Sequence, residues 1–519
     1  MAGPRLTPII VGVGDVCNKS LDLANAFEPA ELMIRAINAA LQDSGIAEPD
    51  FAAQLDSISV VPPWTWPYPD LPGLLAEKLG SKPAHRAIGK YHGGNQPALL
   101  CDEAARRVAA GEARVAVVTG GEALASLAVC QKAGKFPPPG WSTPDPSSGT
   151  ISASDTSRLG QSIGGRHSVG LPIHVYPMYE NAFRSHEGQT IADNTQESAE
   201  MYAAFDEVAC KQSYSWRSGQ KPKSASDIGT LSPKNRMICL PYPLLMNAFN
   251  TVNLSAACIL TSTEHAKKLG IPEDKWVYVL GGAGTSDSSQ FWERPNYFSS
   301  PALTQSLDAA LEASGITKND IDCFDIYSCF PIVPKLACKH LGLNAARPEK
   351  PITVLGGLTS FGGAGNNYSM HAMTEMSRLI RRDKVKTGLV LANGGVLTYQ
   401  HALCLSRKPR RDKAAYPPQN PLPDFSKGVT APPVSIDPQG RAIIETYTVD
   451  FDRNGKPQLG YIVGRLETGD KARFVANHGD DSTLAKLTDT TLEPIGRRGV
   501  VRQAEDGRNM FFIDQGGKL

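Results

Sequence analysis

At 519 residues the chain is too long for a single hydrophobic core, and we expect two or three domains. Its 53 Lys and Arg nearly balance its 52 Asp and Glu, so charge gives no reason to expect nucleic acid or an acidic membrane surface as the main partner. The ten cysteines form no C-x-x-C pairs or Cys/His clusters, and no run of about 18 apolar residues occurs, so neither a metal site, a disulfide framework nor a membrane span is predicted.

The two ends of the chain bear on its location. The first residues, MAGPRLTPIIVGVGD, lead directly into a strand-like stretch without the basic flank and cleavage site of a secretory signal. We therefore expect a cytoplasmic protein with reduced thiols. The ending Gly517-Lys518-Leu519 differs from the peroxisomal signal S-K-L only at its first residue, so peroxisomal import is the alternative.

Two segments read almost alike, AALQDSGI at 39–46 and AALEASGI at 309–316. Each ends an amphipathic helix, and Gly45 and Gly315 stand where a left-handed cap residue is needed. Each is followed by an acidic turn and an apolar strand. The pattern indicates two copies of one helix-turn-strand unit.

A second matching pair lies further along, at 101–122 and 371–396. Each member is a helix followed by a strand that ends in two glycines. The offset between the copies is nearly the same as in the first pair, which makes coincidence a poor explanation. The sequence therefore predicts a duplicated, layered α/β fold.

Between the copies lies an insertion, residues 123–250. Its first part is rich in Pro, Ser, Gly and Thr and should be loop, whereas 190–217 carries apolar residues at helical spacing. We assign 1–122 and 251–281 to the first half of the duplication and 282–408 to the second.

The C-terminal part changes character again. Residues 409–434 are a Pro-rich linker without periodicity. Residues 435–519 alternate apolar and polar residues, with turns at Arg453-Asn454-Gly455 and Thr468-Gly469-Asp470. That meander is long enough for a small β-barrel, and it shows no aromatic platform for single-stranded nucleic acid.

The duplicated halves and the long insertion resemble the thiolase fold over residues 1 to about 408. In thiolases a nucleophilic cysteine opens a helix, and a glycine-rich strand end finishing in Glu follows at a fixed spacing. Counting back from Glu122 by that spacing places the nucleophile position on Gly94, in HGGNQPALL. The cysteine is absent.

The second half shows the same loss. The loop that reads N-E-A-F or H-D-C-F in the family reads Tyr327-Ser328-Cys329-Phe330 here. The segment with the catalytic histidine, G-G-x-x-x-x-G-H-P, appears as GGLTSFGGAGNNYSMH, with Gly363 at the histidine position. The C-x-G-G-G segment with the second cysteine appears as LANGGVLTYQH, without a thiol. The resemblance therefore implies that cysteine-dependent thiolase activity is lost.

The chain resembles one divergent branch more specifically, thiolase-like protein type 1, which carries an additional C-terminal domain. The motifs behind this resemblance are YPMYENAFR (176–184), SPKNRMICLPYPLLMNA (232–248), YSCFP (327–331), GGAGNNYSMHA (362–372) and NGGVLTYQHA (393–402). Members are commonly named acetyl-CoA acetyltransferases. The resemblance implies an OB-like C-terminal barrel, and a similar fold is the partner of steroid side-chain aldolases, which are themselves thiolase-fold proteins.

Three side chains are candidates to replace the lost catalytic groups. Tyr327 stands in the family's catalytic loop, where a phenol could donate to an enolate oxygen or take a proton; a tyrosine in the comparable motif of thiolase-fold aldolases has a catalytic role. His371, expected in the first turn of a helix, is a candidate relocated base, and His401 could face the same cavity. The alternative for each is an ordinary buried anchor.

Further residues are predicted to bind substrate beside the vacant nucleophile position Gly94. They are His92, Asn95, Glu122, Asn366, Asn367, Tyr368 and Asn393. Asn95 is expected at a helix N-terminus, whose backbone N–H groups favour an oxyanion. Cys329 is the one thiol near the site, and we expect it to be buried rather than catalytic.

Two functions stay open. The first is an enzyme that acts on acyl-CoA or a related thioester by aldolase-like C–C bond chemistry, without a cysteinyl intermediate; retained Tyr, His and Asn residues favour it. The second is a non-catalytic acyl-CoA-binding or scaffold protein, which the loss of the thiolase groups favours. Coenzyme A thioester is the expected substrate or ligand, with no bound cofactor. The thiolase resemblance implies association through the central sheet into a homodimer, and the alternative is that the additional domain blocks that surface.

Overall fold

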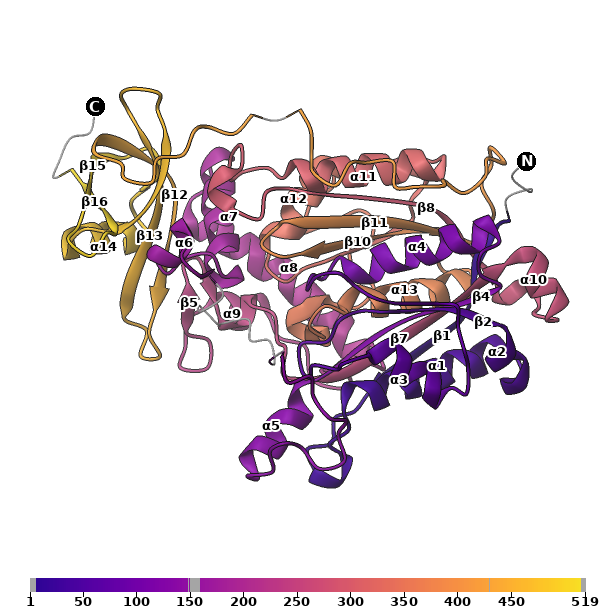
Figure 1. The fold of residues 1–519 in the computed structure, drawn as a ribbon. Coiled ribbons are helices and arrows are strands. Elements are labelled where there is room, and N and C mark those ends of the chain that lie inside the picture. Colours follow the sequence, from indigo (N-terminus) through magenta and orange to yellow (C-terminus); the bar gives the residue numbers. More distant parts are fainter. Residues whose placement is uncertain (1–5, 148, 150–158, 429, 515–519) are drawn as a thin grey trace.

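The computed structural model describes residues 6–147, 149, 159–428 and 430–514 (Figure 1). The C-terminal Gly517-Lys518-Leu519, on which the peroxisomal alternative depends, lies outside these residues. No helix in the described part of the chain is both long and apolar enough to cross a bilayer.

One nine-stranded sheet contains the strands of both halves, in the order β3-β2-β4-β7-β1-β8-β11-β10-β9. The first five belong to the first half and the last four to the second, and they meet where β1 pairs with β8. Since β8 begins at Val277, the boundary expected at 281/282 falls inside this strand, and the second half begins a few residues earlier. The strands are β1 Pro8–Cys17, β2 Leu55–Val60, β3 His85–Ile88, β4 Val115–Ala123, β7 Asn253–Ser262, β8 Val277–Ser286, β9 Cys323–Ile326, β10 Thr387–Gly394 and β11 Tyr399–Ser406.

The predicted duplication is confirmed in the helices. The copies AALQDSGI and AALEASGI end α1 and α11, and both caps, Gly45 (φ 77°) and Gly315 (φ 67°), are left-handed, which glycine adopts without steric cost. Two helices, α4 and α13, contact each other and lie between strands of the two halves (Figure 1). The helices of the halves are α1 Pro29–Ser44, α2 Glu48–Gln54, α3 Leu71–Lys78, α4 Gln96–Ala110, α10 Thr263–Lys268, α11 Pro301–Ser314, α12 Ile332–Leu341 and α13 Tyr368–Arg381.

The insertion is helical, and the helix predicted in its middle is confirmed as α8. Its elements are α5 Leu124–Lys132, α6 Ile163–Arg166, α7 Pro172–His186, α8 Ile191–Lys211, α9 Ala225–Gly229, β5 Met237–Cys239 and β6 Tyr242–Pro243. The short strand β5 pairs with β12 of the C-terminal domain, which the sequence did not indicate. Single-turn 3-10 helices lie at Leu23–Asn25, Leu244–Met246, Glu273–Lys275, Phe291–Glu293 and Lys318–Asp320, and a π-helical turn at Leu358–Gly362.

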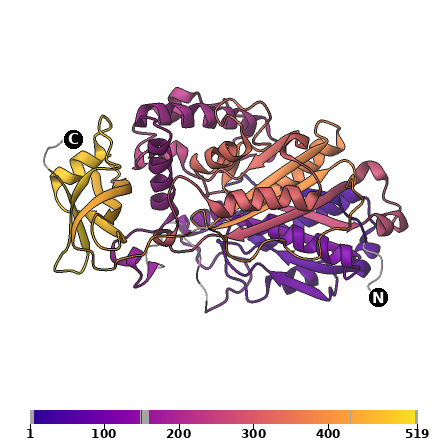
Figure 2. The ribbon, with the colours of Figure 1, turned by 90° about the horizontal axis from the view of Figure 1, so that it is seen from above.

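The predicted C-terminal barrel is present and closed. Its five strands pair in the cycle β12-β13-β14-β16-β15-β12, and it lies at one end of the molecule beside α7 (Figures 1 and 2). A short helix, α14, was not predicted. The elements are β12 Gly440–Phe451, β13 Pro457–Leu466, β14 Arg473–His478, α14 Asp481–Thr488, β15 Arg498–Gln503 and β16 Asn509–Ile513.

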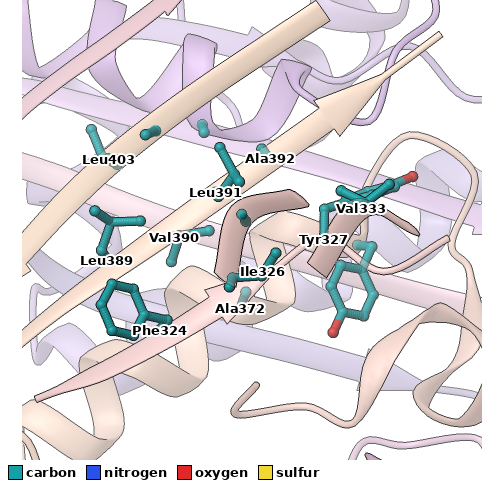
Figure 3. Close-up of a cluster of buried hydrophobic side chains, with 14 of the residues drawn as sticks. Phe324, Ile326, Tyr327, Val333, Ala372, Leu389, Val390, Leu391, Ala392 and Leu403 are labelled. Atoms are coloured by element: carbon teal, nitrogen blue, oxygen red, sulfur yellow. The ribbon is translucent and has the colours of Figure 1, made fainter. Parts of the chain in front are cut away.

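The core of the second half places the segment that carries the family's catalytic loop. Phe324 and Ile326 on β9 are in parallel register with Leu389 and Leu391 on β10, and all four are buried (Figure 3). Tyr327 follows directly at the carboxyl end of β9 (Figure 3). The Tyr327 amide donates a hydrogen bond to the Leu391 carbonyl (2.9 Å), so the pairing of β9 with β10 also positions Tyr327.

Candidate functional site

A cavity of about 550 Å³ lies where the N-terminus of α4, the end of β9, the start of α7 and the turn after β10 meet. Much of its wall is apolar or aromatic, and it includes Trp64, Leu171, Ile173, Tyr176, Phe330 and Tyr399. Four polar residues that the sequence singled out also line it, namely His92, Tyr327, Asn366 and Asn393. An apolar cavity with a few polar groups is the usual form of a small-molecule site.

Gly94 lies in the cavity wall next to Asn95, the N-cap of α4. A Cβ atom on Gly94 would lie 2.6 Å from Cε2 of Tyr327 and 2.5 Å from the carbonyl oxygen of Asn393, and it would overlap the Tyr327 hydroxyl. The phenol therefore occupies the space that a side chain at position 94 would need. Glycine at 94 and tyrosine at 327 are a matched pair, and a cysteine does not fit beside this tyrosine.

The hydroxyl of Tyr327 is the side-chain polar group nearest the position that a Cβ atom on Gly94 would take. The side chain is 6% exposed, its ring meets that of Tyr368 edge-on at 5.6 Å, and its hydroxyl forms no hydrogen bond with any described residue. Burial raises the pKa of Tyr327 well above its ordinary value. The phenol stays protonated, so it can donate a hydrogen bond into the cavity but is a poor base.

Tyr176 on α7 supports the cavity wall opposite α4. Its hydroxyl accepts hydrogen bonds from Asn393 Nδ2 (2.8 Å) and from the Leu397 amide (3.1 Å), and it donates to the Gly395 carbonyl (3.2 Å). Its ring stacks on Phe330 at 4.8 Å. Tyr176 begins the YPMYENAFR motif, but this role was not predicted, because helical spacing does not show which face of a helix meets a cavity.

The side-chain amide of Asn366 determines which ring nitrogen of neutral His92 carries the proton. Trp64 Nε1 donates to Asn366 Oδ1 (3.0 Å), while Asn366 Nδ2 contacts the Pro62 carbonyl (2.8 Å) and His92 Nδ1 (3.0 Å). An indole N–H only donates and a carbonyl only accepts, so the amide has one orientation. His92 Nδ1 must accept, and the neutral ring therefore carries its proton on Nε2.

Glu122 lies behind the cavity wall rather than in it. Its carboxylate accepts hydrogen bonds from the Trp64 amide (2.6 Å), the Thr65 amide (3.1 Å) and the Thr65 hydroxyl (2.5 Å). Burial raises the pKa of Glu122 to about 7, although these hydrogen bonds lower it. The structure thus places Glu122 as a support for Trp64, and Asn367, whose Nδ2 donates to the Gly120 carbonyl (2.7 Å), also stays outside the cavity lining.

The two candidate histidines do not line the cavity that holds Gly94 and Tyr327. His371 Nδ1 lies 2.6 Å from Asp15 Oδ1 on β1, and His401 Nε2 lies 2.8 Å from Asp102 Oδ2 on α4. Burial alone would raise the pKa of Asp15, but the hydrogen bond of His371 and the charge of Arg378 lower it below its ordinary value. Both histidines join the halves of the fold, in pairings that sequence spacing does not reveal.

The remaining predicted residues divide by position. Asn95 is at the helix N-terminus as expected, but its Nδ2 donates to the Tyr91 hydroxyl (2.9 Å) rather than facing the cavity. Tyr368 is fully buried, and its hydroxyl accepts from the Gly357 amide (3.1 Å). Cys329 does line the cavity, and burial raises its pKa to about 12. Among the described residues no group of His, Cys, Asp and Glu could hold a metal ion.

Comparison with known proteins identifies both parts of the chain. Residues 283–407 match the family model "Thiolase C-terminal domain-like", and 421–506 match "Thiolase-like protein type 1 additional C-terminal domain". No curated protein matches the chain in sequence. Two solved structures share the fold over part of the chain: the Ltp2-ChsH2(DUF35) aldolase (18% identity, TM-score 0.55, 78% of this chain and 98% of that one) and human mitochondrial 3-ketoacyl-CoA thiolase (14%, 0.55, 77% and 99%).

A further solved structure is similar over nearly the whole length. It is a monomeric SCP2-thiolase like protein type 1 from Mycobacterium smegmatis, with 31% identity and a TM-score of 0.80, and the match covers 98% of this chain and 100% of that one. The duplicated thiolase fold, the additional barrel and this similarity agree. The chain belongs to the SCP2-thiolase-like protein type 1 family.

Proposed function

We propose that the protein binds an acyl thioester, or a related carbonyl compound, non-covalently in the cavity beside Gly94. In this complex the Tyr327 hydroxyl donates a hydrogen bond to the carbonyl oxygen. One observation carries the proposal: a buried phenol without a partner among the described residues lies at the N-terminus of α4. The partial positive charge of a helix N-terminus favours an oxygen that carries partial negative charge.

The binding is non-covalent because the cavity offers no activated thiol. Position 94 is glycine, and the thiol of Cys329, with a pKa of about 12, stays protonated at neutral pH. The thiolate is the nucleophilic form of cysteine, so Cys329 is a poor acyl acceptor. The thiolase fold, of which one solved member is human mitochondrial 3-ketoacyl-CoA thiolase in complex with CoA, supports coenzyme A thioesters as the ligand class.

The second candidate function is aldolase-like cleavage or formation of a C–C bond. An enolate oxygen carries more negative charge than a ground-state carbonyl, so the Tyr327 hydrogen bond would strengthen along such a reaction. The availability of that hydroxyl favours this function. The buried hydrogen bonds of His371 to Asp15 and of His401 to Asp102, outside the cavity lining, count against these two as its base and place plain binding first.

Calorimetric titration with coenzyme A, acetyl-CoA, octanoyl-CoA and a medium-chain 3-hydroxyacyl-CoA tests both functions. We expect thioesters to bind and Tyr327→Phe to weaken binding by about tenfold, the value of one hydrogen bond to a polarised oxygen. Tyr68→Phe, which removes a hydroxyl bonded to Glu28 outside this cavity, should leave binding unchanged.

The same mixtures, followed by mass spectrometry, separate binding from catalysis. Retro-aldol cleavage would convert the 3-hydroxyacyl-CoA into acetyl-CoA and the shortened aldehyde, with the β-hydroxyl proton leaving to a base. Binding without these products supports the first function, and their appearance only with Tyr327 present supports the second. If none of the thioesters binds, the proposal is wrong.

A further inference from the structure

The turn after β10 forms part of the cavity wall and holds a strained residue. Gly394, Gly395, Val396 and Thr398 line the cavity. Between them Leu397 is fully buried with a φ of 62°, in the left-handed region. That conformation is unfavourable for a residue other than glycine, and it persists only when the surroundings determine it.

Arg294 contacts this turn from behind the cavity. It is 1% exposed, and its Nη1 donates to the Val396 carbonyl (2.6 Å) and to the Tyr179 hydroxyl (3.0 Å). Its Nη2 donates to the Thr398 hydroxyl (3.0 Å). The guanidinium thus holds the residues on both sides of the strained Leu397.

The partners of Arg294 are unusual for a buried cation. Every acceptor that receives one of its hydrogen bonds is a neutral oxygen, including the Ser288 carbonyl on Nε (3.0 Å). Burying a charge without a directly bonded carboxylate is costly, so net stabilisation is a weak reason for its presence. A planar, five-donor fork is, however, well suited to fixing several backbone and hydroxyl groups in one geometry.

The barrel contacts the backbone of Arg294. Arg473 on β14 is fully buried, forms an ion pair with Glu445 on β12 (2.6 Å), and donates to the carbonyls of Trp292 (3.1 Å) and Arg294. Its guanidinium also lies over the Tyr297 ring at 4.9 Å. A continuous path therefore runs from the barrel through Arg294 to the cavity wall.

We propose that Arg294 is a positioning residue that sets the cavity wall at 394–398, and that the barrel controls this wall by fixing Arg294 through Arg473. The C-terminal domain is then part of the binding site's framework rather than an independent module. This concerns the shape of the wall and does not depend on the ligand or chemistry proposed above, so it can fail or succeed separately.

Hydrogen–deuterium exchange of the full-length protein, resolved by peptide, tests the proposal without a ligand. In Arg294→Lys and Arg473→Lys we expect peptides covering 394–402 to exchange at least about tenfold faster, while peptides from α1 and β7 keep their protection. The amides of Leu397 and Thr398, which bond Tyr176 Oη and the Gly394 carbonyl, report the change directly.

Two further variants make the result decisive. Arg381→Lys is the control, because Arg381 also donates to a backbone carbonyl, that of Lys275 (2.8 Å), but lies at the end of α13 and outside the cavity lining; it should leave 394–402 unchanged. Thr398→Val removes one acceptor of Arg294 together with the acceptor of the Val396 amide (3.3 Å), and it should speed exchange locally by a smaller factor. Unchanged 394–402 exchange in Arg473→Lys would overturn the barrel's part, and unchanged exchange in Arg294→Lys and Thr398→Val would overturn the whole.

Discussion

Helices α4 and α13 are copies of one element, yet their N-termini meet different surroundings. The start of α4 faces the cavity, with Gly94 in its wall and the Tyr327 hydroxyl beside it. At α13 only the preceding loop reaches the cavity, through Gly365 and Asn366, whereas the first helical residue, Tyr368, is fully buried and hydrogen-bonded to the Gly357 amide. The two helix starts therefore meet the cavity differently: the backbone of Gly94 lies in its wall beside α4, and a side-chain amide stands in it before α13.

The same helices are alike in a second feature, a buried His–Asp hydrogen bond to the opposite half. Asp102 on α4 pairs with His401 on β11, and His371 on α13 pairs with Asp15 on β1. Arg378 also forms an ion pair with Asp15, at 2.6 Å. The buried polar residues around α4 and α13 therefore fall into two groups: some join the two halves of the fold, and others face the cavity.

The largest expected effect comes from breaking one of these buried His–Asp pairs. His371→Ala leaves Asp15 buried with only part of its compensation, and we expect the free energy of unfolding to fall by about 3–5 kcal/mol in urea titrations. His340→Ala is the matched control, because His340 pairs with Asp308 at 2.7 Å on the surface and should cost less than about 1 kcal/mol. Equal losses in the two variants would refute the distinction.

Which parts of the fold and the site the sequence could predict depends on how far apart along the chain the interacting residues lie. The caps Gly45 and Gly315 and the strands of the barrel meander are local patterns, and they were predicted. The pairing of His371 with Asp15 joins residues at opposite ends of the duplicated fold, and β5 enters a sheet whose other strands lie far along the chain. Only the folded chain brings such partners together, so residue spacing could not reveal them.

The pH dependence of stability should distinguish the Glu122 carboxylate from the Asp15 carboxylate. The folded-state pKa of Glu122 is raised from 4.5 to about 7, so the folded protein holds this proton more tightly than the unfolded chain. Its contribution is fully present below about pH 4.5 and is lost as pH rises to about 7, a fall of about 3 kcal/mol in the free energy of unfolding.

Glu122→Gln, which cannot ionise, should lack this fall between pH 5 and pH 7, measured by urea unfolding at each pH. Asp15 behaves oppositely: its pKa is lowered, so its contribution is present above its unfolded pKa and is lost in acid, in the wild type and in the variant alike. A pH profile of Glu122→Gln that matches the wild type between pH 5 and 7 would show that Glu122 is ionised throughout.

A smaller effect tests the matched pair in the cavity. Gly94→Ala should lower the free energy of unfolding by about 1–3 kcal/mol, because its Cβ overlaps the Tyr327 ring and approaches the Asn393 carbonyl. Combining it with Tyr327→Ala should relieve part of that cost, giving a favourable coupling of about 0.5–3 kcal/mol in a double-mutant cycle. Strict additivity would mean that the phenol does not occupy the space at position 94.

The most direct test of the central claim is the intact mass of the protein after incubation with acetyl-CoA and octanoyl-CoA. Because the Tyr327 phenol fills the place of the nucleophile and the Cys329 thiol stays protonated, we predict calorimetric binding with no acyl adduct on the protein. An acyl group found on the wild type and absent from Cys329→Ser would contradict this account, since it would show that thioester exchange has moved to another cysteine.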